Sequence, residues 1–210
     1  MLLHNDYYYW EGELDEKVCN KIIALGSEKF SPATVWVQKH PITTEEKTTG
    51  HNLKPQVIEG YRKSDVVWLD EKWVRYLVLP YMWEANKEAG WDFDIDEIDR
   101  VQLTRYKVGE FYDWHCDGMS DTIAGIKRLG GVGEGKVRKL SMSILLNDNY
   151  EGGEFQYSDY TEEVVSHNII PSKKIGTIVI FPSFKEHRIL SVTKGIKYSL
   201  VTWFLGPPFK

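Results

Sequence analysis

Two stretches of the sequence decide the fold and the candidate site. Residues 106–117 read YKVGEFYDWHCD and contain an H-x-D pair, His115 and Asp117. Residues 187–197 read HRILSVTKGIK and begin with a single histidine, His187. If the backbone of the H-x-D pair is extended, residues i and i+2 point to the same side of the strand. His115 and Asp117 then reach one point, and strand pairing has to bring His187 beside them.

Two imidazoles and one carboxylate suit a divalent iron bound on one triangular face, with three coordination positions left open. His115, Asp117 and His187 are therefore candidate metal ligands, and Cys116 is expected to point away from them. An H-x-D pair alone is common in proteins. Taken singly, each histidine is equally compatible with a surface position or with a hydrogen-bonded place in the core.

Length and composition set the class of protein. The 210 residues suffice for one sizeable core, and the 13% of aromatic residues suit a β-rich interior. The net charge of −5 lacks the basic face that a nucleic-acid duplex requires, so no nucleic acid is expected as a partner. Two cysteines make no disulfide framework, and no stretch approaches the ~18 apolar residues that span a membrane. We expect a cytoplasmic protein without a signal peptide or membrane contact, with a monomer favoured.

Hydrophobic periodicity predicts two helices before the β-rich part. The first covers residues 16–28, with Asp15 as N-cap and Cys19 in the core. The second covers residues 71–88, with Asp70 as N-cap, a kink or restart at Pro80, and Gly90 beyond its end. Its aromatic stripe is expected to pack on a sheet; the stripe is Trp73, Tyr76 and Trp83 with Leu77 and Met82.

Short alternating or apolar runs predict strands at residues 7–10, 34–38, 64–69, 101–105, 140–146, 155–157, 177–181, 189–192 and 197–204. Residues 39–60, which include His40 and His51, are polar and predict an irregular surface segment. The periodicity by itself supports a β-rich α+β fold, a sandwich or barrel with N-terminal helices.

An ordered set of residues carries a family resemblance: Tyr106, His115, Asp117, EGGE at 151–154, His187, Lys197 and Trp203. Over residues 99–207 the chain resembles the Fe(II)- and 2-oxoglutarate-dependent dioxygenases, most closely the prolyl 4-hydroxylase-like branch. The resemblance implies a double-stranded β-helix (jelly roll) over 99–207, supported by residues 1–98 in a single domain of 210 residues.

The same resemblance implies roles for individual residues. His115, Asp117 and His187 would hold Fe(II), which 2-oxoglutarate chelates and O₂ then approaches. Lys197 would bind the 5-carboxylate of 2-oxoglutarate, with help from Tyr106 and Ser141. Without the resemblance, Lys197 would be interpreted as an exposed strand lysine and Ser141 as an ordinary strand serine.

The implied activity is hydroxylation of a prolyl residue in a peptide or protein, with conversion of 2-oxoglutarate to succinate and CO₂ and with ascorbate as a support. Tyr112 and Trp203 match family positions that contact the peptidyl proline, and core packing is the alternative for both. Phe155 departs from the family, which usually has threonine after Gly-Gly-Glu. Other substrates remain open: a lysyl residue, a free amino acid or an alkylated base. A non-catalytic metal-binding or interaction module on the same fold also remains open.

Residues 118–139 hold six glycines and a net positive charge. The segment is interpreted either as a lid that orders on substrate binding or as a solvated loop. Its basic residues would favour an acidic peptide; they are Lys127, Arg128, Lys136, Arg138 and Lys139. GGVGEG at 130–135 is not a phosphate loop, because no Gly-Lys-Ser/Thr follows it.

Overall fold

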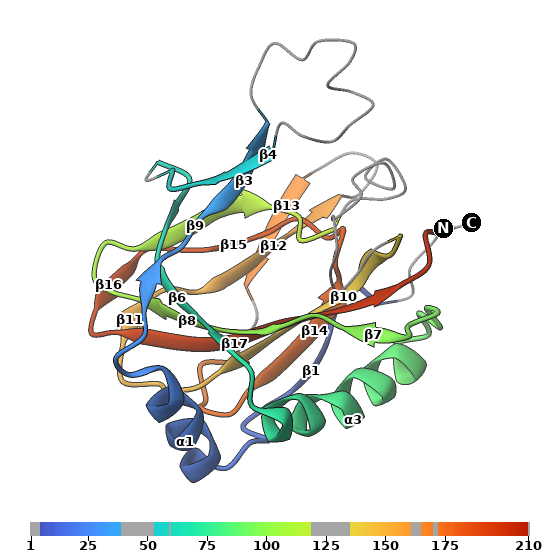
Figure 1. The fold of residues 1–210 in the computed structure, drawn as a ribbon, viewed down its shortest axis with the longest axis horizontal. Coiled ribbons are helices and arrows are strands. Elements are labelled where there is room, and N and C mark those ends of the chain that lie inside the picture. The colour runs from blue at the N-terminus through green and yellow to red at the C-terminus, as the bar shows by residue number, and fades with distance from the viewer. Residues whose placement is uncertain are drawn as a thin grey trace.

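Two antiparallel sheets face each other, and two helices cover the outer face of the larger sheet (Figure 1). The computed structural model describes residues 5–38, 53–58, 60–118, 135–160, 165–169 and 172–209. The architecture is the double-stranded β-helix expected from the sequence. None of the helices in these ranges is long and apolar enough to cross a membrane.

The larger sheet has eight strands, and its order is β1-β14-β10-β17-β8-β6-β2 with β7 paired to β17. Its strands are β1 (Tyr8–Trp10), β14 (Ile178–Pro182), β10 (Val137–Leu145), β17 (Lys197–Gly206), β8 (Val101–Tyr106), β6 (Asp65–Leu69), β2 (Ser31–Pro32) and β7 (Glu97–Ile98). β10 and β17 lie at its centre, so they carry side chains into both the helical layer and the space between the sheets.

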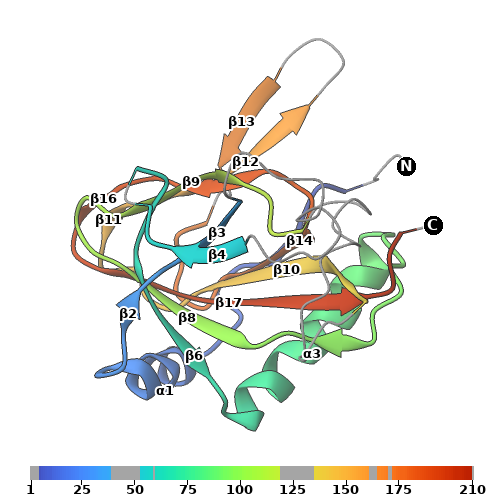
Figure 2. The same ribbon diagram turned by 45° about the horizontal axis from the view of Figure 1, so that its top comes forward.

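The smaller sheet has five strands in the order β13-β12-β15-β9-β5. They are β13 (Val165–Ile169), β12 (Phe155–Tyr160), β15 (His187–Ile189), β9 (Phe111–His115) and β5 (Arg62–Lys63). Figure 2 shows the β12–β13 hairpin extending beyond the rest of the molecule. Two further pairs are β11 (Glu151–Gly152) with β16 (Val192–Lys194), and β3 (Val35–Gln38) with β4 (Leu53–Gln56).

The two faces of the larger sheet differ in chemistry because strand side chains alternate. On β10, Leu140, Met142 and Ile144 join the core shared with the helices. Ser141 and Ser143 have the opposite parity, so they lie on the face toward the smaller sheet. The same alternation on β8 and β17 makes the space between the sheets polar. This polar interior is where the candidate site lies.

The helix α1 (Glu16–Gly26) confirms the expected N-cap: the Asp15 carboxylate accepts a hydrogen bond from the Lys17 backbone N–H at 2.8 Å. Cys19 is fully buried, as expected for a core thiol. Burial raises the pKa of that thiol to about 11, so it stays protonated.

The helix α3 (Lys72–Glu88) corrects the expected N-cap and excludes a restart at Pro80. Its N-cap is Glu71 rather than Asp70, and Glu71 makes no side-chain capping bond. The helix also continues through Pro80 without a restart. Pro80 is exposed, so water can satisfy the carbonyl that loses its helical partner there. Gly90 follows the helix with a φ of +68°, as expected for a residue just past a helix end.

The aromatic stripe of α3 is only partly buried. Val74, Val78 and Met82 form the buried face, whereas Tyr76 is 69% exposed and Trp83 is 52% exposed. Tyr76 is two positions from Val74, which turns it to the opposite side of a helix with 3.6 residues per turn. The expectation that Tyr76 and Trp83 pack on the sheet was wrong for this reason.

Two segments expected to be irregular contain strands. β4 lies inside the segment 39–60 and pairs with β3, and β10 begins at Val137 inside the segment 118–139. The rest of the lid, residues 119–134, lies outside the described residues, as do His40 and His51. The strand expected at 189–192 is divided between β15 and β16. β2, β5, β7 and β11 were not predicted, because a strand of two residues carries no readable period, and the five-residue β13 was also missed.

Candidate metal centre

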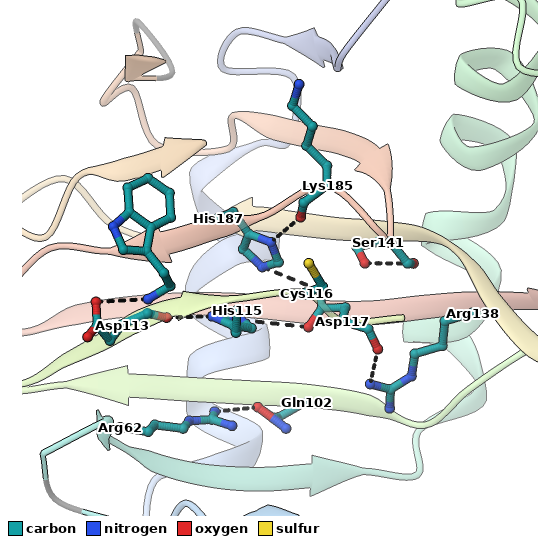
Figure 3. Close-up of polar contacts among 12 residues, drawn as sticks. Arg62, Gln102, Asp113, His115, Cys116, Asp117, Arg138, Ser141, Lys185 and His187 are labelled. Atoms are coloured by element: carbon teal, nitrogen blue, oxygen red, sulfur yellow. Dashed lines mark hydrogen bonds and ion pairs between the residues drawn. The ribbon is translucent and has the colours of Figure 1, made fainter. Parts of the chain in front are cut away.

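Neighbouring strands of the smaller sheet bring the two histidines together. His115 ends β9 and lies opposite His187, which begins β15. Asp117 follows two residues after His115, and its carboxylate oxygens lie 3.8 Å from His115 Nε2 and 3.5 Å from His187 Nε2. One ligand atom from each of the three lies within 4.8 Å of the others (Figure 3). The three side chains thus point at one shared position.

Backbone carbonyls set the orientation of both imidazoles. His115 Nδ1 lies 2.7 Å from the carbonyl oxygen of Asp113, and His187 Nδ1 lies 2.9 Å from that of Lys185. A carbonyl oxygen only accepts, so each Nδ1 carries the hydrogen. Each Nε2 lone pair is then free to face the shared position, as in metal sites whose histidines are held by a second hydrogen bond.

Aromatic rings hold the imidazoles from the side. Tyr112 stacks on His115 with ring centroids 3.5 Å apart and planes 15° apart. Phe155 lies nearly parallel to His187, with centroids 5.4 Å apart. Phe155 is the residue that departs from the family pattern, and its ring occupies the side of a metal-facing histidine. Both histidines are therefore restrained in tilt as well as in tautomer.

The charges at this position suit a cation. Burial, together with the charge of His187, lowers the pKa of His115 to about 3, so His115 is neutral at physiological pH. Burial opposes ionisation of Asp117, but the two histidines and Arg138 outweigh it and lower the pKa of that carboxyl. Two imidazoles and one carboxylate form the donor set of a three-ligand iron site. The residues present therefore fit Fe(II).

Cys116 lies between two of these residues in the sequence. It is exposed, and its Sγ lies 3.3 Å from the carbonyl oxygen of Phe184. Burial of the sulfur region, with the negative charge of Glu186, raises the pKa of the thiol to about 11. The thiolate, which is the reactive form, is scarce at neutral pH.

Lys197 is a buried cation inside the double-stranded β-helix. Its side chain is on the first residue of β17, is 5% exposed, and donates a hydrogen bond to the carbonyl oxygen of Gly153 at 2.7 Å. No carboxylate is in ion-pair contact with it among the described residues. Burial lowers its pKa to about 8. Such a group is ready to receive an anionic partner, and the interpretation as an exposed strand lysine is wrong.

A cavity opens beside Lys197, and hydroxyl-bearing and small residues share its lining with the apolar side chains of Leu145, Phe155 and Val179. Six of its lining residues are Ser143, Tyr150, Gly153, Thr177, Lys197 and Ser199. Tyr106 lies directly opposite Lys197 in the β8–β17 pairing and is 4% exposed. Burial raises the pKa of Tyr106, so it remains a neutral hydrogen-bond donor. The lining also holds Lys173 and Glu154, which pair with each other, so Lys197 and the hydroxyl donors are left to bind a carboxylate.

Ser141 lies at the other end of the sheet from Lys197. It pairs with Trp203, six residues further along β17, which is about 20 Å of extended strand. Its hydroxyl shares a hydrogen bond with Ser183 at 2.9 Å. The register therefore argues against Ser141 and Lys197 touching the same carboxylate, and Ser143 and Ser199 are the serines beside the lysine.

Tyr112 and Trp203 occupy different surroundings. Tyr112 is partly exposed and stacks on His115, so it borders the shared position. Trp203 is 6% exposed and lies under the Arg138 guanidinium at 3.7 Å. Its buried Nε1–H has no hydrogen-bond partner among the described residues, yet it lies near enough to Asp117 to help lower the pKa of that carboxyl. Trp203 is therefore placed to orient Asp117.

The described basic residues of the expected lid are already engaged. Lys136 pairs with Asp96 and Glu97 at 2.9 Å, and Arg138 pairs with Asp99 at 2.8 Å. Lys139 is 3% exposed. These three side chains belong to β10 and its approach, so the suggested attraction of an acidic peptide would rest on Lys127 and Arg128, which lie outside the described residues.

Two residues at the site were missed from the sequence. Arg62 on β5 and Gln102 on β8 are both buried and hydrogen-bonded to each other at 2.9 Å. Strand alternation could have placed Gln102 on the face between the two sheets, because it has the same parity as Tyr106 on β8. Arg62 gave no such signal, because β5 has only two residues.

The family assignment follows from the arrangement together with the sequence match. The family model of the 2OG-Fe(II) oxygenase superfamily matches residues 101–205, half of the chain. The chain belongs to this superfamily. The match includes the three converging side chains and Lys197, and it starts at the first residue of β8.

Individual relatives in this superfamily are hydroxylases by name. A PKHD-type hydroxylase of Psychrobacter sp. (strain PRwf-1) is 35% identical over 103 residues, which is 48% of this chain and 36% of that protein. Human prolyl 3-hydroxylase 2 is 34% identical over 73 residues, covering 34% of this chain and 10% of that protein. The aligned part is thus well under two thirds of these relatives' length.

Solved structures share the fold. A Pseudomonas putida prolyl-4-hydroxylase superposes with a TM-score of 0.64 at 16% identity, covering 95% of this chain and 92% of that one. A viral collagen prolyl hydroxylase from Paramecium Bursaria Chlorella virus-1 gives 0.62 at 19% identity, covering 96% and 97%. At these identities the likeness concerns the double-stranded β-helix alone.

Proposed function

We propose that this chain is an Fe(II)- and 2-oxoglutarate-dependent dioxygenase that hydroxylates a prolyl residue in a peptide or protein and releases succinate and CO₂. The observation that carries the proposal is the convergence of His115, Asp117 and His187 on one position within 4.8 Å. Family membership supports the cofactor and cosubstrate, because the superfamily is defined by iron and 2-oxoglutarate.

His115, Asp117 and His187 are the residues that would hold the iron. When bound, the iron with 2-oxoglutarate and O₂ supplies the oxidising power for attack on an unactivated C–H bond. The protein contributes the fixed geometry: two backbone-anchored tautomers and an ionised carboxylate. Ascorbate would support turnover by keeping the iron reduced.

Lys197 and Tyr106 would hold the 5-carboxylate of 2-oxoglutarate. Both are buried and lie opposite each other across β17 and β8, so their positions are set by main-chain pairing. A protonated lysine in a site from which water is largely removed binds a carboxylate more strongly than it would in water. Ser143 and Ser199 are better placed than Ser141 to assist.

Tyr112 is the residue we favour for contact with the target proline. It is partly exposed, borders His115, and presents a ring face of the type on which proline packs. The names of several relatives, which are prolyl hydroxylases, support a prolyl substrate. A lysyl residue, a free amino acid or an alkylated base would use the same centre.

The proposal is tested by incubating the protein with Fe(II), ascorbate, 2-oxoglutarate and a panel of proline-containing peptides. We expect a mass increase of one oxygen on a proline, with one succinate released per hydroxylation. His115→Ala and Asp117→Ala should both abolish turnover and the thermal stabilisation by Mn(II), which such donor sets also accept. Lys194→Met, on an exposed strand, is the control and should retain both.

Two outcomes would change the proposal. Steady 2-oxoglutarate turnover with every proline peptide unmodified would remove the prolyl substrate and leave the chemistry. Metal binding without any succinate release would instead favour a non-catalytic module. A buried lysine with no carboxylate in ion-pair contact in the described part of the chain speaks against that module, because a site that binds no cosubstrate gains nothing from a buried charge.

A further inference from the structure

A second buried cation lies inside the double-stranded β-helix, on the other side of Tyr112 from the candidate metal position. Arg62 is 9% exposed and pairs with Tyr112 between β5 and β9. Its guanidinium carbon lies 4.4 Å from the Tyr112 ring centroid, and that centroid lies 3.5 Å from the His115 ring. Arg62 is therefore within about 8 Å of a proposed metal ligand.

The partners of Arg62 are neutral. Nε donates to the Ser64 hydroxyl at 3.1 Å, and Nη2 donates to Gln102 Oε1 at 2.9 Å. No carboxylate is in ion-pair contact with this guanidinium among the residues the structure describes. By contrast, Arg105 and Arg138 each contact an aspartate, at 2.7 and 2.8 Å. A buried charge is costly unless it is paired, so the missing partner calls for a reason.

Donors of this pair remain available. Within the described part of the chain Arg62 Nη1 has no hydrogen-bond partner, and it is not among the buried atoms sealed from solvent without one. Gln102 Oε1 accepts from Arg62 and also from Thr104 at 3.2 Å. Because arginine only donates, the Gln102 amide must turn its oxygen toward it, and the amide N–H groups face away. Arg62 Nη1 and Gln102 Nε2 thus form a neighbouring pair of unused donors (Figure 3).

A count of the charges in the site with iron and cosubstrate bound also suggests that Arg62 binds an anion. Asp117 and the dianionic cosubstrate together balance Fe(II) and Lys197, if the proposed function holds. The positive charge of Arg62 is then left with no carboxylate in ion-pair contact among the described residues. A planar guanidinium with free N–H groups matches the geometry of a carboxylate better than that of a neutral amide.

We propose that Arg62 and Gln102 bind a carboxylate of the prime substrate and so select the substrate class. This inference rests on the proposed function for its charge count, but the donors and the missing counter-ion are observed independently of it. The carboxylate has two possible sources: the α-carboxylate of a C-terminal or free target residue, or the side chain of an acidic residue beside an internal target.

Binding measurements test the inference without turnover. Protein loaded with Mn(II) and 2-oxoglutarate is titrated with N-acetylproline and with N-acetylprolinamide, which differ only in the carboxylate. We expect the acid to bind about tenfold or more tightly than the amide. In Arg62→Gln this preference should disappear while the affinity for 2-oxoglutarate stays unchanged. Arg62→Lys, which keeps the charge and loses the fork, should retain part of the preference.

Arg188→Gln is the matched control. Arg188 also lies over an aromatic ring, with its guanidinium 4.5 Å from Trp114, and also bonds to a glutamine, Gln156, at 2.7 Å. It follows His187 on β15, so it points to the opposite face of the sheet. This variant should keep the preference of the wild type. Melting curves of all three variants verify that each is folded. If Arg62→Gln does not fold, Arg62→Lys is used in its place to measure the loss of preference.

Peptide turnover separates the two sources of the carboxylate. One pair of peptides carries a C-terminal proline as free acid or as amide, and a second pair carries an internal proline next to Glu or Gln. Faster turnover of the acid in one pair, lost in Arg62→Gln, identifies the source. Equal binding of N-acetylproline and its amide by the wild type, or a preference that survives in Arg62→Gln, overturns the inference. Carboxylate selection without any 2-oxoglutarate consumption would instead refute the proposed function and leave this inference standing.

Discussion

Replacing Lys197 with methionine should stabilise the protein and at the same time destroy cosubstrate binding. Methionine is close to lysine in length and volume and carries no charge. The wild-type lysine is 5% exposed, donates a hydrogen bond to the Gly153 carbonyl and lies 5.8 Å from the Tyr150 ring centroid, with no carboxylate in ion-pair contact among the described residues. The cost of burying its charge is therefore present in the folded protein before 2-oxoglutarate binds, and Lys197→Met removes it.

The magnitude follows from the pKa of Lys197. Burial lowers this pKa from its ordinary value of 10.5 to about 8 in the folded protein. The difference corresponds to about 3 kcal/mol of destabilisation below pH 8, where both states hold the proton. Loss of the hydrogen bond to Gly153 offsets about 1 kcal/mol. At pH 7 we expect Lys197→Met to be about 2 kcal/mol more stable, which raises Tm by several degrees.

The pH dependence of the stability difference tests the role of Lys197 more sharply than the difference at pH 7 alone. Above pH 8 the folded wild type releases the proton that the unfolded chain still holds, so the stability of the wild type rises with pH up to about 10.5. Between pH 7 and 9.5 the rise is about 2 kcal/mol. Lys197→Met lacks this titration, so its advantage over the wild type should shrink to almost nothing at pH 9.5.

Urea denaturation of the metal-free protein at pH 7 and 9.5 measures both quantities, and calorimetry with Mn(II) measures the affinity for 2-oxoglutarate. Lys194→Met is the control, since the Lys194 side chain is 75% exposed. It should show neither the pH-dependent difference nor a loss of affinity. If Lys197→Met binds 2-oxoglutarate as the wild type does, or if its stability difference is independent of pH, the assigned role of Lys197 is wrong.

Three further predictions concern single contacts. Trp203→Phe keeps the ring under Arg138 and removes only the N–H near Asp117, so metal affinity should fall about tenfold or more; a change confined to the KM of the peptide would make Trp203 a substrate contact instead. Gly153→Ala should lower the unfolding free energy by more than Gly90→Ala, because both have positive φ but only at Gly153 would a Cβ lie 2.9 Å from a valine methyl; equal losses in urea would contradict this. Asp15→Ala should cost about 1 kcal/mol through the lost helix cap and leave turnover unchanged, as thermal melts and succinate assays can verify.

Local chemistry made the metal position predictable. The H-x-D spacing indicated two side chains that reach one point, and the family resemblance added His187. β9 ends at His115, so Asp117 lies two residues beyond the strand. The Asp15 cap was predictable for a similar reason, because a cap involves residues two or three positions apart. Asp70 has the same residue type at a similar place, yet the chain begins α3 one residue later. Residue preference thus narrows the N-cap to a few positions, but it does not decide between adjacent residues such as Asp70 and Glu71.

Strand register distinguishes Ser141 from Ser143, which residue type and parity do not. Ser141 and Ser143 have the same parity on β10, so residue type and parity cannot decide which serine lies beside Lys197. The β10–β17 pairing places Ser141 opposite Trp203, whereas Ser143 lines the cavity beside Lys197. Only the alignment of two strands more than fifty residues apart makes that distinction.

The sequence alone determined which residues carry the chemistry and which faces of the strands are apolar, because both depend on residue type and on spacing within one element. The tertiary structure decided which distant groups share a space. It placed Lys197 against Gly153 and brought Arg62 and His115 both against the Tyr112 ring. Among the described residues it gave Arg62 no carboxylate in ion-pair contact. Those juxtapositions arise from pairing between strands far apart in the chain, and no periodicity within a single strand encodes them.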